Sequence, residues 1–214
     1  MADYTKQLND ISELLQKGKA KDIALAVQQA LDDGVPAGDI LEKALIAGMS
    51  IIGGKFKRGE VFVPEVLIAA RAMNKASETL KPALIEAGVT PVGKALICTV
   101  KGDLHDIGKN LVKMMLEGRG IEVNDLGVDC DTQKIVDAVK TSGAGVLCLS
   151  ALLTTTMMAQ KDVIDALKNA GIRESVKVMV GGAPVTQGFA DEIGADAYTS
   201  DAASAAEVCR AFYN

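Results

Sequence analysis

The sequence predicts an α/β protein with an N-terminal all-α domain, in which a helical bundle precedes a flavodoxin-like, Rossmann-like five-stranded parallel sheet. Residues 1–88 carry apolar side chains at helical spacing and show no strand pattern. Residues 89–214 instead alternate short apolar runs with helical stretches, which is typical of a doubly wound sheet. Of the 214 residues, 49% are hydrophobic but only 3% are aromatic, so the core should be aliphatic. We therefore predict two domains, a four-helix bundle over 1–88 and an α/β domain over 89–214.

Four amphipathic helices are expected in the first domain. Glycines close the first two helices, and the pair Gly53-Gly54 is expected to end the third. Pro64 suits the first turn of the fourth helix, where a backbone N–H is not needed. Because the connections are short, the helices should form an antiparallel bundle. Their apolar stripes span Leu8–Leu15, Ile23–Leu31, Ile40–Ile52 and Val66–Leu80.

The segment from Pro82 to Gly93 is rich in proline and glycine and predicts the linker between the domains. Five strand candidates follow it, each with a helical stretch behind it. The second strand alternates apolar and polar residues, as an edge strand does, whereas the first and third are apolar throughout. We expect a flavodoxin-like strand order. The strand candidates are Ala95–Val100, Ile121–Asp125, Gly145–Leu149, Val176–Val180 and Ala195–Tyr198.

Charge and composition exclude several classes of function. The chain has 23 basic and 28 acidic residues, a net charge of −5, and no basic block, which argues against nucleic-acid and anionic membrane partners. The first residues are polar and no apolar run is long enough to span a membrane, so a cytoplasmic protein is expected. Four cysteines without a CxxC spacing predict buried, reduced thiols: Cys98, Cys130, Cys148 and Cys209.

The run from Val100 to Lys109 connects the first strand to a helix, at the strand end where open α/β sheets bind ligands. It contains His105, the only histidine of the chain, between Asp103 and Asp106. One imidazole supplies too few ligands for a zinc site. A single protein ligand suffices when a cofactor ring fills the other positions of the metal, as in haem or a corrinoid. These residues alone leave open a solvated loop whose histidine has no role.

Asp103-x-His105-x-x-Gly108 resembles the DxHxxG signature of cobalamin-binding domains. The longer run 102–110 is similar to the version found in methionine synthase and in methanogen-type corrinoid proteins. The resemblance implies one cobalamin or related corrinoid per chain, with His105 as the lower ligand to cobalt. It further implies that Asp103 and Thr156 form a cobalt-tuning relay with His105, Thr156 standing where methionine synthase has a serine. The motif residues expected at the cofactor are Gly102, Asp103, Leu104, His105, Asp106 and Gly108.

Two more loops follow strands and should emerge at the same edge of the sheet. They are Ser150–Thr156 after the third strand and Gly181-Gly182-Ala183 after the fourth. Hydroxyls and glycines are ordinary at strand ends, so as bare sequence these loops are weak signals. In the cobalamin domains that the chain resembles, such loops hold the nucleotide tail of the corrinoid. The resemblance assigns this contact to Ser150, Leu152, Thr154, Gly181, Gly182 and, more loosely, the backbone of Ala202.

Two of the four phenylalanines fall in the segment 54–65, between the third and fourth helices. A hydrophobic staple at the start of the fourth helix is one explanation. The segment also resembles the helical cap that shields the upper face of the corrin in methionine synthase and related methyl carriers. Val63 stands where a leucine is expected in that family. The resemblance makes Glu42, Phe56, Phe62, Val63 and Val66 cap residues.

Over the whole chain, the resemblance is to the methyltransferase corrinoid proteins. It implies a carrier that accepts methyl as Co(I) from a donor-specific methyltransferase and passes it from methyl-Co(III) to tetrahydrofolate or coenzyme M. The implied partners are those two methyltransferases and a reductive activase, in one-carbon metabolism such as methylotrophy. The carrier is expected to have no independent activity. The sequence names neither the donor nor the acceptor.

Three alternatives stand beside this one. The cobalamin-binding subunit of a mutase shares DxHxxG but does not need the cap. A cobalamin-responsive regulator would need a DNA-binding module, for which an acidic chain of this length has no room. A phospho-receiver domain shares only the fold, and it would need a lysine at the end of the last strand, where Tyr198-Thr199-Ser200 stands.

Overall fold

A computed structural model describes residues 4–214. These residues form two compact units, which divide between Pro91 and Val92. Each unit has buried apolar residues of its own. The boundary expected between residues 88 and 89 lies just before this division.

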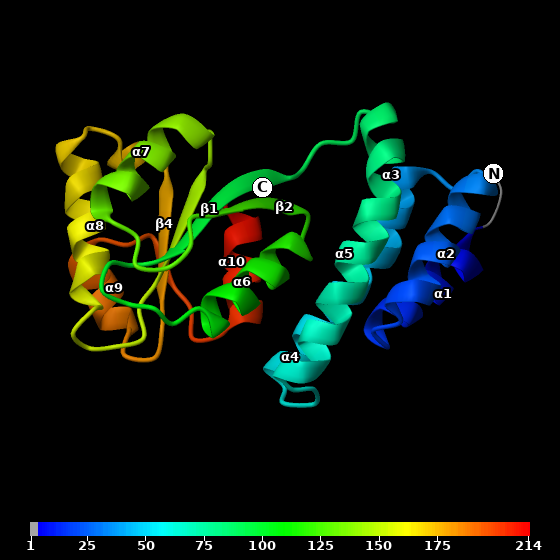
Figure 1. The fold of residues 1–214 in the computed structure, drawn as a ribbon, viewed down its shortest axis with the longest axis horizontal. Helices are drawn as coiled ribbons and strands as arrows, with labels where there is room; N and C mark the ends of the chain where they lie inside the picture. The colour runs from blue at the N-terminus through cyan, green and yellow to red at the C-terminus, as the bar shows by residue number, and fades with distance from the viewer. Residues whose placement is uncertain (1–3) are drawn as a thin grey trace. The chain divides into compact units, whose positions relative to one another are not determined.

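Four helical rods make up the described part of the first unit (Figure 1). α1 packs against α2 and α4, and α2 packs along α5, so the predicted bundle is confirmed. The third rod is continuous but changes its hydrogen-bonding pattern, because a π-helix, η1, lies between α3 and α4. π-helices are rare and occur frequently at functional sites. The bounds are α1 Thr5–Gln16, α2 Ala20–Asp32, α3 Ala37–Asp39, η1 Ile40–Ile46, α4 Ala47–Lys57 and α5 Val63–Glu86.

The third rod does not end at Gly53-Gly54, so this prediction is wrong. α4 continues to Lys57, and the N–H of Gly59 then bonds to the carbonyl of Phe56 as the helix ends. Glycine costs a helix about 1 kcal/mol relative to alanine, but Gly53 is buried and its packing outweighs that penalty. As a consequence Phe56 lies in the last turn of α4, not in a loop.

The linker also begins later than predicted, because α5 runs through Pro82 to Glu86. A proline inside a helix removes one backbone hydrogen bond, here to the carbonyl of Glu78. Both Pro82 and Glu78 are exposed, so water can satisfy that carbonyl. The buried face of the helix ends at Leu80, before the proline.

The second unit is a parallel sheet with strand order β2-β1-β3-β4-β5, the flavodoxin-like order that the sequence predicts. α6 and α10 lie together on one face, and α7, α8 and α9 cover the other (Figure 1). β2 is an edge strand with alternating burial, as expected. The strands are β1 Gly93–Thr99, β2 Ile121–Asp125, β3 Val146–Ser150, β4 Lys177–Gly181 and β5 Ala197–Tyr198. The helices are α6 Ile107–Glu117, α7 Thr132–Ser142, α8 Met158–Asn169, α9 Gln187–Ile193 and α10 Ala202–Ala211, with a 3-10 turn, η2, at Arg173–Ser175.

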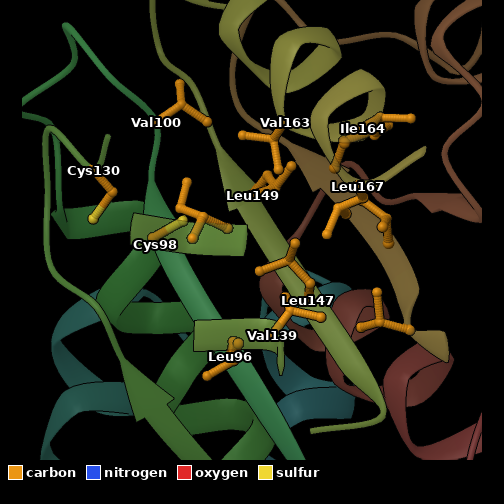
Figure 2. Packing of buried hydrophobic residues seen from close by; sticks show 14 of the residues in the cluster. Leu96, Cys98, Val100, Cys130, Val139, Leu147, Leu149, Val163, Ile164 and Leu167 are labelled. Atoms are coloured by element: carbon orange, nitrogen blue, oxygen red, sulfur yellow. The ribbon is translucent and has the colours of Figure 1, made fainter. Parts of the chain in front are cut away.

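The main core of this unit lies between the sheet and α7, α8 and α9. Figure 2 shows Leu147 and Leu149 of β3 beside Val163 and Leu167 of α8. Burying four such aliphatic side chains contributes about 1.5–3 kcal/mol for each one. This packing makes the sheet a rigid support for the loops at its carboxyl edge.

The cysteine prediction is confirmed: all four thiols are free and buried. Over residues 4–214, no helix is long and apolar enough to cross a membrane.

Candidate functional site

Three loops meet at the carboxyl edge of the sheet. They follow β1, β3 and β4, whose last residues lie in register: Thr99 pairs with Ser150, and Ser150 pairs with Gly181. Beyond these pairs, the N–H of Val100 donates to the carbonyl of Ser150 at 3.0 Å, and the N–H of Ala151 donates to that of Gly181 at 3.1 Å. The three segments singled out in the sequence therefore lie side by side.

The carboxylate of Asp103 accepts four hydrogen bonds at this edge of the sheet. It is fully buried. Oδ1 accepts hydrogen bonds from His105, from the backbone N–H at 3.0 Å and from ring Nδ1 at 2.7 Å. Oδ2 accepts from the backbone N–H of Leu152 at 2.7 Å and from the hydroxyl of Thr156 at 2.6 Å. One carboxylate thus ties the β1–α6 loop to the β3–α8 loop.

Asp103 is ionised in spite of its burial. Burial by itself raises the pKa of this carboxyl, but the hydrogen bonds from Thr156, Leu152 and His105 outweigh it and hold the pKa well below the usual value. An ionised carboxylate only accepts hydrogen bonds. Nδ1 of His105 is therefore the donor in this contact, and Nε2 is the ring nitrogen that Asp103 does not engage.

The ring of His105 is held at its inner nitrogen and open at its outer side. Its side chain is 51% exposed although Nδ1 is engaged. The backbone of His105 is fixed as well, since its carbonyl accepts a hydrogen bond from the hydroxyl of Thr99 at 2.8 Å. Metal-ligating histidines are typically held in this way, with the second nitrogen donating to a carboxylate.

Large apolar side chains around the motif are not buried. Their exposed fractions run from 41% for Leu152 to 77% for Ile107. Exposed apolar side chains concentrated in two short loops and the helices that follow them indicate a binding surface. These side chains are Leu104, Ile107, Leu152, Leu153 and Met158.

The glycine after β4 is required by a close approach within the protein. Gly182 has φ +128°, and a Cβ there would lie 1.7 Å from the carbonyl oxygen of Ala151. The β4–α9 loop therefore packs tightly on the β3–α8 loop. Among the other predicted residues, Ser150 is the partly buried last residue of β3, Thr154 is exposed in the turn that follows, and Ala202 is the buried first residue of α10.

Known proteins resemble the chain over nearly its full length. It is 42% identical to "Dimethylamine corrinoid protein 3" of Methanosarcina acetivorans over 205 residues, which cover 96% of each chain. It is 45% identical to "Monomethylamine corrinoid protein 2" of the same organism over 185 residues, 85% of each. A family model for a B12 binding domain matches residues 93–209, and a second with the same description matches residues 7–81. The chain belongs to the B12-binding corrinoid proteins.

Solved structures of corrinoid proteins agree. The methanol:cobalamin methyltransferase complex MtaBC from Methanosarcina barkeri contains a chain with a TM-score of 0.87 and 31% identity, covering 99% of this chain and 81% of that one. A cobalamin-binding protein from Desulfitobacterium hafniense gives a TM-score of 0.80 at 33% identity, covering 96% and 98%. The cofactor of this chain is accordingly a corrinoid.

The residues present fit a corrinoid. His105 offers one free nitrogen, and the exposed apolar side chains beside it suit a large, flat ring. Gly108 adds an independent observation, because a Cβ at this position in the first turn of α6 would meet no atom within 4 Å. The protein itself therefore does not require a glycine that weakens the helix. A ring that lies close to the start of α6 explains it.

Two residues that hold the loops and strand ends of this edge carry no signal in the sequence. Gln160 is fully buried in α8, and its Nε2 donates to the carbonyl of Leu149 at 3.0 Å and to that of Gly181 at 3.1 Å, clamping the ends of β3 and β4 together. Asp129 has φ +49°, and its Oδ1 accepts from the N–H of Gly102 at 2.7 Å. A helical glutamine and a loop aspartate are both ordinary surface residues by pattern alone. A positive φ favours aspartate over most residues, but the sequence does not reveal that angle.

The five expected cap residues lie in the first unit. Phe62 precedes α5, and its N–H donates to the carboxylate of Glu65 at 2.9 Å. Its ring is 67% exposed, so it does not act as a buried staple in this unit. Of the others, Glu42 is exposed on η1, Phe56 is half-buried in α4, Val63 is half-buried at the start of α5, and Val66 is fully buried in the bundle core.

Proposed function

We propose that this chain carries a methyl group on its corrinoid between two partner methyltransferases, and that the donor is a methylated amine. The observation that carries the first part is the exposed imidazole of His105, whose Nδ1 is held by the buried carboxylate of Asp103. The second part is supported by the relatives. Those named for dimethylamine and monomethylamine are 42% and 45% identical, whereas the chain from the methanol complex is 31% identical.

When bound, the corrinoid supplies the cobalt that accepts and releases the methyl group. The part of His105 is to offer Nε2 to that metal. Asp103 orients the ring and, as a carboxylate that accepts a hydrogen bond from Nδ1, makes the imidazole a stronger donor. Thr156 donates to the same carboxylate and so adjusts its charge. A proton held by these three side chains weakens the donation, which gives the chain a means of adjusting the ligand to each stage of transfer.

The nucleotide tail of the corrinoid is the second point of attachment in this proposal. We assign its hydrogen bonds to the side chains of Ser150 and Thr154, and its close backbone contacts to Gly181, Gly182 and Ala202. Support comes from the register that aligns Ser150 with Gly181 and from the clamp by Gln160 between their strands. In the first unit, Glu42, Phe56, Phe62 and Val63 would cover the upper face of the ring, with Val66 supporting them from the core.

Three partners follow from this function. A donor-specific methyltransferase would deliver the methyl group, and a second methyltransferase would pass it to tetrahydrofolate or coenzyme M. A reductive activase would return the metal to its reactive state after accidental oxidation. Each partner needs access to the upper face, so the first unit would have to move aside when a partner docks.

The experiment begins with the visible spectrum of the purified chain after loading with cobalamin. Wild type is expected to show a histidine-ligated corrinoid, whereas His105→Ala should retain the cofactor and lose that ligand, because the tail contacts remain. Identical spectra of the two oxidised proteins would contradict the assignment of His105.

Methyl transfer is tested next with isotopically labelled monomethylamine, dimethylamine and methanol, each with its matching donor methyltransferase. Label should pass to the loaded wild-type protein from an amine. If label passes from methanol alone, the chain is still a methyl carrier, but the proposal that its donor is a methylated amine is wrong. A loaded protein that accepts no methyl group but supports a carbon-skeleton rearrangement would make it a mutase subunit instead.

A further inference from the structure

Lys109 is a buried lysine beside the corrinoid site. Only 3% of it is exposed, and all three N–H groups of its ammonium have acceptors. Nζ lies 2.7 Å and 2.6 Å from the two carboxylate oxygens of Asp125, at the end of β2, and 2.8 Å from the side-chain oxygen of Asn110. A buried charge is costly unless it is fully paired, so this contact fixes the position of the first turn of α6.

On one side, the ion pair is connected to Asp106, the residue after His105. Asn110 bonds twice to Asp106: its backbone N–H donates to the carbonyl at 2.7 Å, and its side-chain amide donates to the carboxylate at 3.1 Å. The chain of contacts from Lys109 therefore ends next to the histidine.

On the other side, the pair is connected to the backbone of His105 itself. Oδ1 of Asp125 accepts from the N–H of Gly127 at 3.0 Å, and the carbonyl of Gly127 accepts from the N–H of Thr99 at 3.0 Å. The hydroxyl of Thr99 then donates to the carbonyl of His105 at 2.8 Å. These contacts thus form a closed circuit, which runs from His105 through Thr99, Gly127, Asp125, Lys109 and Asn110 to Asp106.

We propose that the buried Lys109–Asp125 pair is the positioning device that holds the backbone of His105 where its ring can reach the cobalt. The inference rests on the proposed function, since it takes His105 as the metal ligand. Asp103 holds the imidazole through Nδ1, whereas the circuit of contacts through Lys109 holds the main chain at the carbonyl of His105 and at Asp106. Two independent restraints, one on the ring and one on the main chain, fix the direction of Nε2. Removing such a supporting contact typically weakens metal ligation about 10–100-fold.

Lys113 provides a matched control on the same helix, one turn later. Its Nζ lies 3.6 Å from the same carboxylate of Asp125, but its side chain is 32% exposed and the circuit closes without it, because Lys109 is the residue that joins Asp125 to Asn110. Lys109→Met removes the buried charge and keeps much of the volume, while Lys109→Arg restores the charge. Lys113→Met removes an equal charge and leaves every contact of the circuit in place.

The first measurement is amide hydrogen exchange of the corrinoid-free chain. In Lys109→Met, the amides of Asp103 and His105 should exchange about tenfold faster than in wild type, beyond any change in the amides of β4.

The second measurement is the absorption spectrum of the loaded protein as a function of pH, which gives the ratio of histidine-ligated to unligated corrinoid. This ratio should fall about 10–100-fold in Lys109→Met, recover in Lys109→Arg, and stay at the wild-type value in Lys113→Met.

A purely structural role would lower the stability of the whole unit, leave the ligation ratio unchanged and raise exchange equally in β4 and the loop; this result overturns the proposal. If Lys109→Met does not fold, Asp125→Asn decides, because it keeps an acceptor for Gly127 and loses the ion pair. Wild-type exchange in the loop of a folded Asp125→Asn protein would also overturn it. If wild type takes up no corrinoid, the proposed function fails, while the exchange comparison still decides whether the pair fixes the loop.

Discussion

Asp103 concentrates the electrostatics of the site in one buried carboxylate. A buried ionised group is stable only when donors surround it, and here the backbone supplies two of the four. The other two come from the imidazole of the motif and from the hydroxyl of Thr156, which the family resemblance implied. The carboxylate therefore stabilises the fold and holds the imidazole of His105 at the same time.

Asp103→Asn should lower the free energy of unfolding at pH 7 by about 1–3 kcal/mol, because the new amide N–H faces donors. The depressed pKa of folded Asp103 predicts how this difference changes with pH. The stabilisation by the ionised carboxylate is complete above the unfolded pKa of about 3.9, and it is lost as pH falls toward the folded value. Urea unfolding of both proteins between pH 7 and pH 2.5 measures the difference, which should shrink below about pH 4. A difference that grows in acid would contradict the assignment.

Gly108→Ala should move stability and binding in opposite directions. The corrinoid-free protein should gain up to about 1 kcal/mol, because alanine is a better helix former and its Cβ meets no other atom within 4 Å. Corrinoid binding should weaken, because the methyl group occupies the space we assign to the ring. Gly188→Ala is the control: Gly188 takes the same second position in α9 and should gain stability without losing corrinoid. Undiminished corrinoid affinity in Gly108→Ala would place the ring elsewhere.

At the scale of elements, strands were predicted better than helix ends and the loops that follow those ends. Strand ends in a doubly wound sheet follow from apolar runs, and β2 was predicted to the residue. Helix ends depend on packing that single residues do not reveal. α4 continues through Gly53-Gly54 because Gly53 is packed in the core, and α5 continues through Pro82 because the proline lies on the exposed face of the helix. The π-helix that carries Glu42 has no sequence signature at all.

The β3–α8 loop has the role of holding the corrinoid tail in our proposal. Replacing Ser150 and Thr154 together by valine should weaken corrinoid retention, since each lost hydrogen bond costs about 0.5–1.5 kcal/mol. The fold should survive, because the backbone contacts of this loop to Asp103 and Gly181 remain. Dialysis of the loaded proteins against buffer measures retention. Thr155→Val, an exposed neighbour, should retain corrinoid as wild type does, and equal retention by the double variant would remove the loop from the tail site.

At the scale of the whole molecule, the sequence was most informative where chemistry and local structure coincide. DxHxxG directly after a buried strand located Asp103 and His105, because motif and strand end occupy the same ten residues. Lys109, Gln160 and Asp125 were missed, because their role depends on partners brought close only by the fold. Contacts across the sheet edge are long-range in sequence, and no local pattern encodes them.

The helical unit carries the two phenylalanines that we expect to cover the corrinoid. Phe56 and Phe62 are two of only four phenylalanines, and the ring of Phe62 is 67% exposed in its own unit. An exposed aromatic ring on a bundle that needs no aromatics for its core is explained if it covers the corrinoid. Changing both residues to alanine should leave the bundle folded, which circular dichroism checks, since the apolar stripes of α1, α2 and α5 are aliphatic.

The loaded double variant should lose its methyl group to light faster than wild type, and its reduced form should oxidise faster in air, because the rings no longer exclude water and oxygen. Leu25→Ala is the matched control, as Leu25 is 72% exposed on α2 and is not among the expected cap residues. It should behave as wild type in both assays. Rates that stay unchanged in a folded Phe56→Ala, Phe62→Ala protein would mean that these rings do not cover the cofactor, and the bundle would then need another explanation for its exposed phenylalanine.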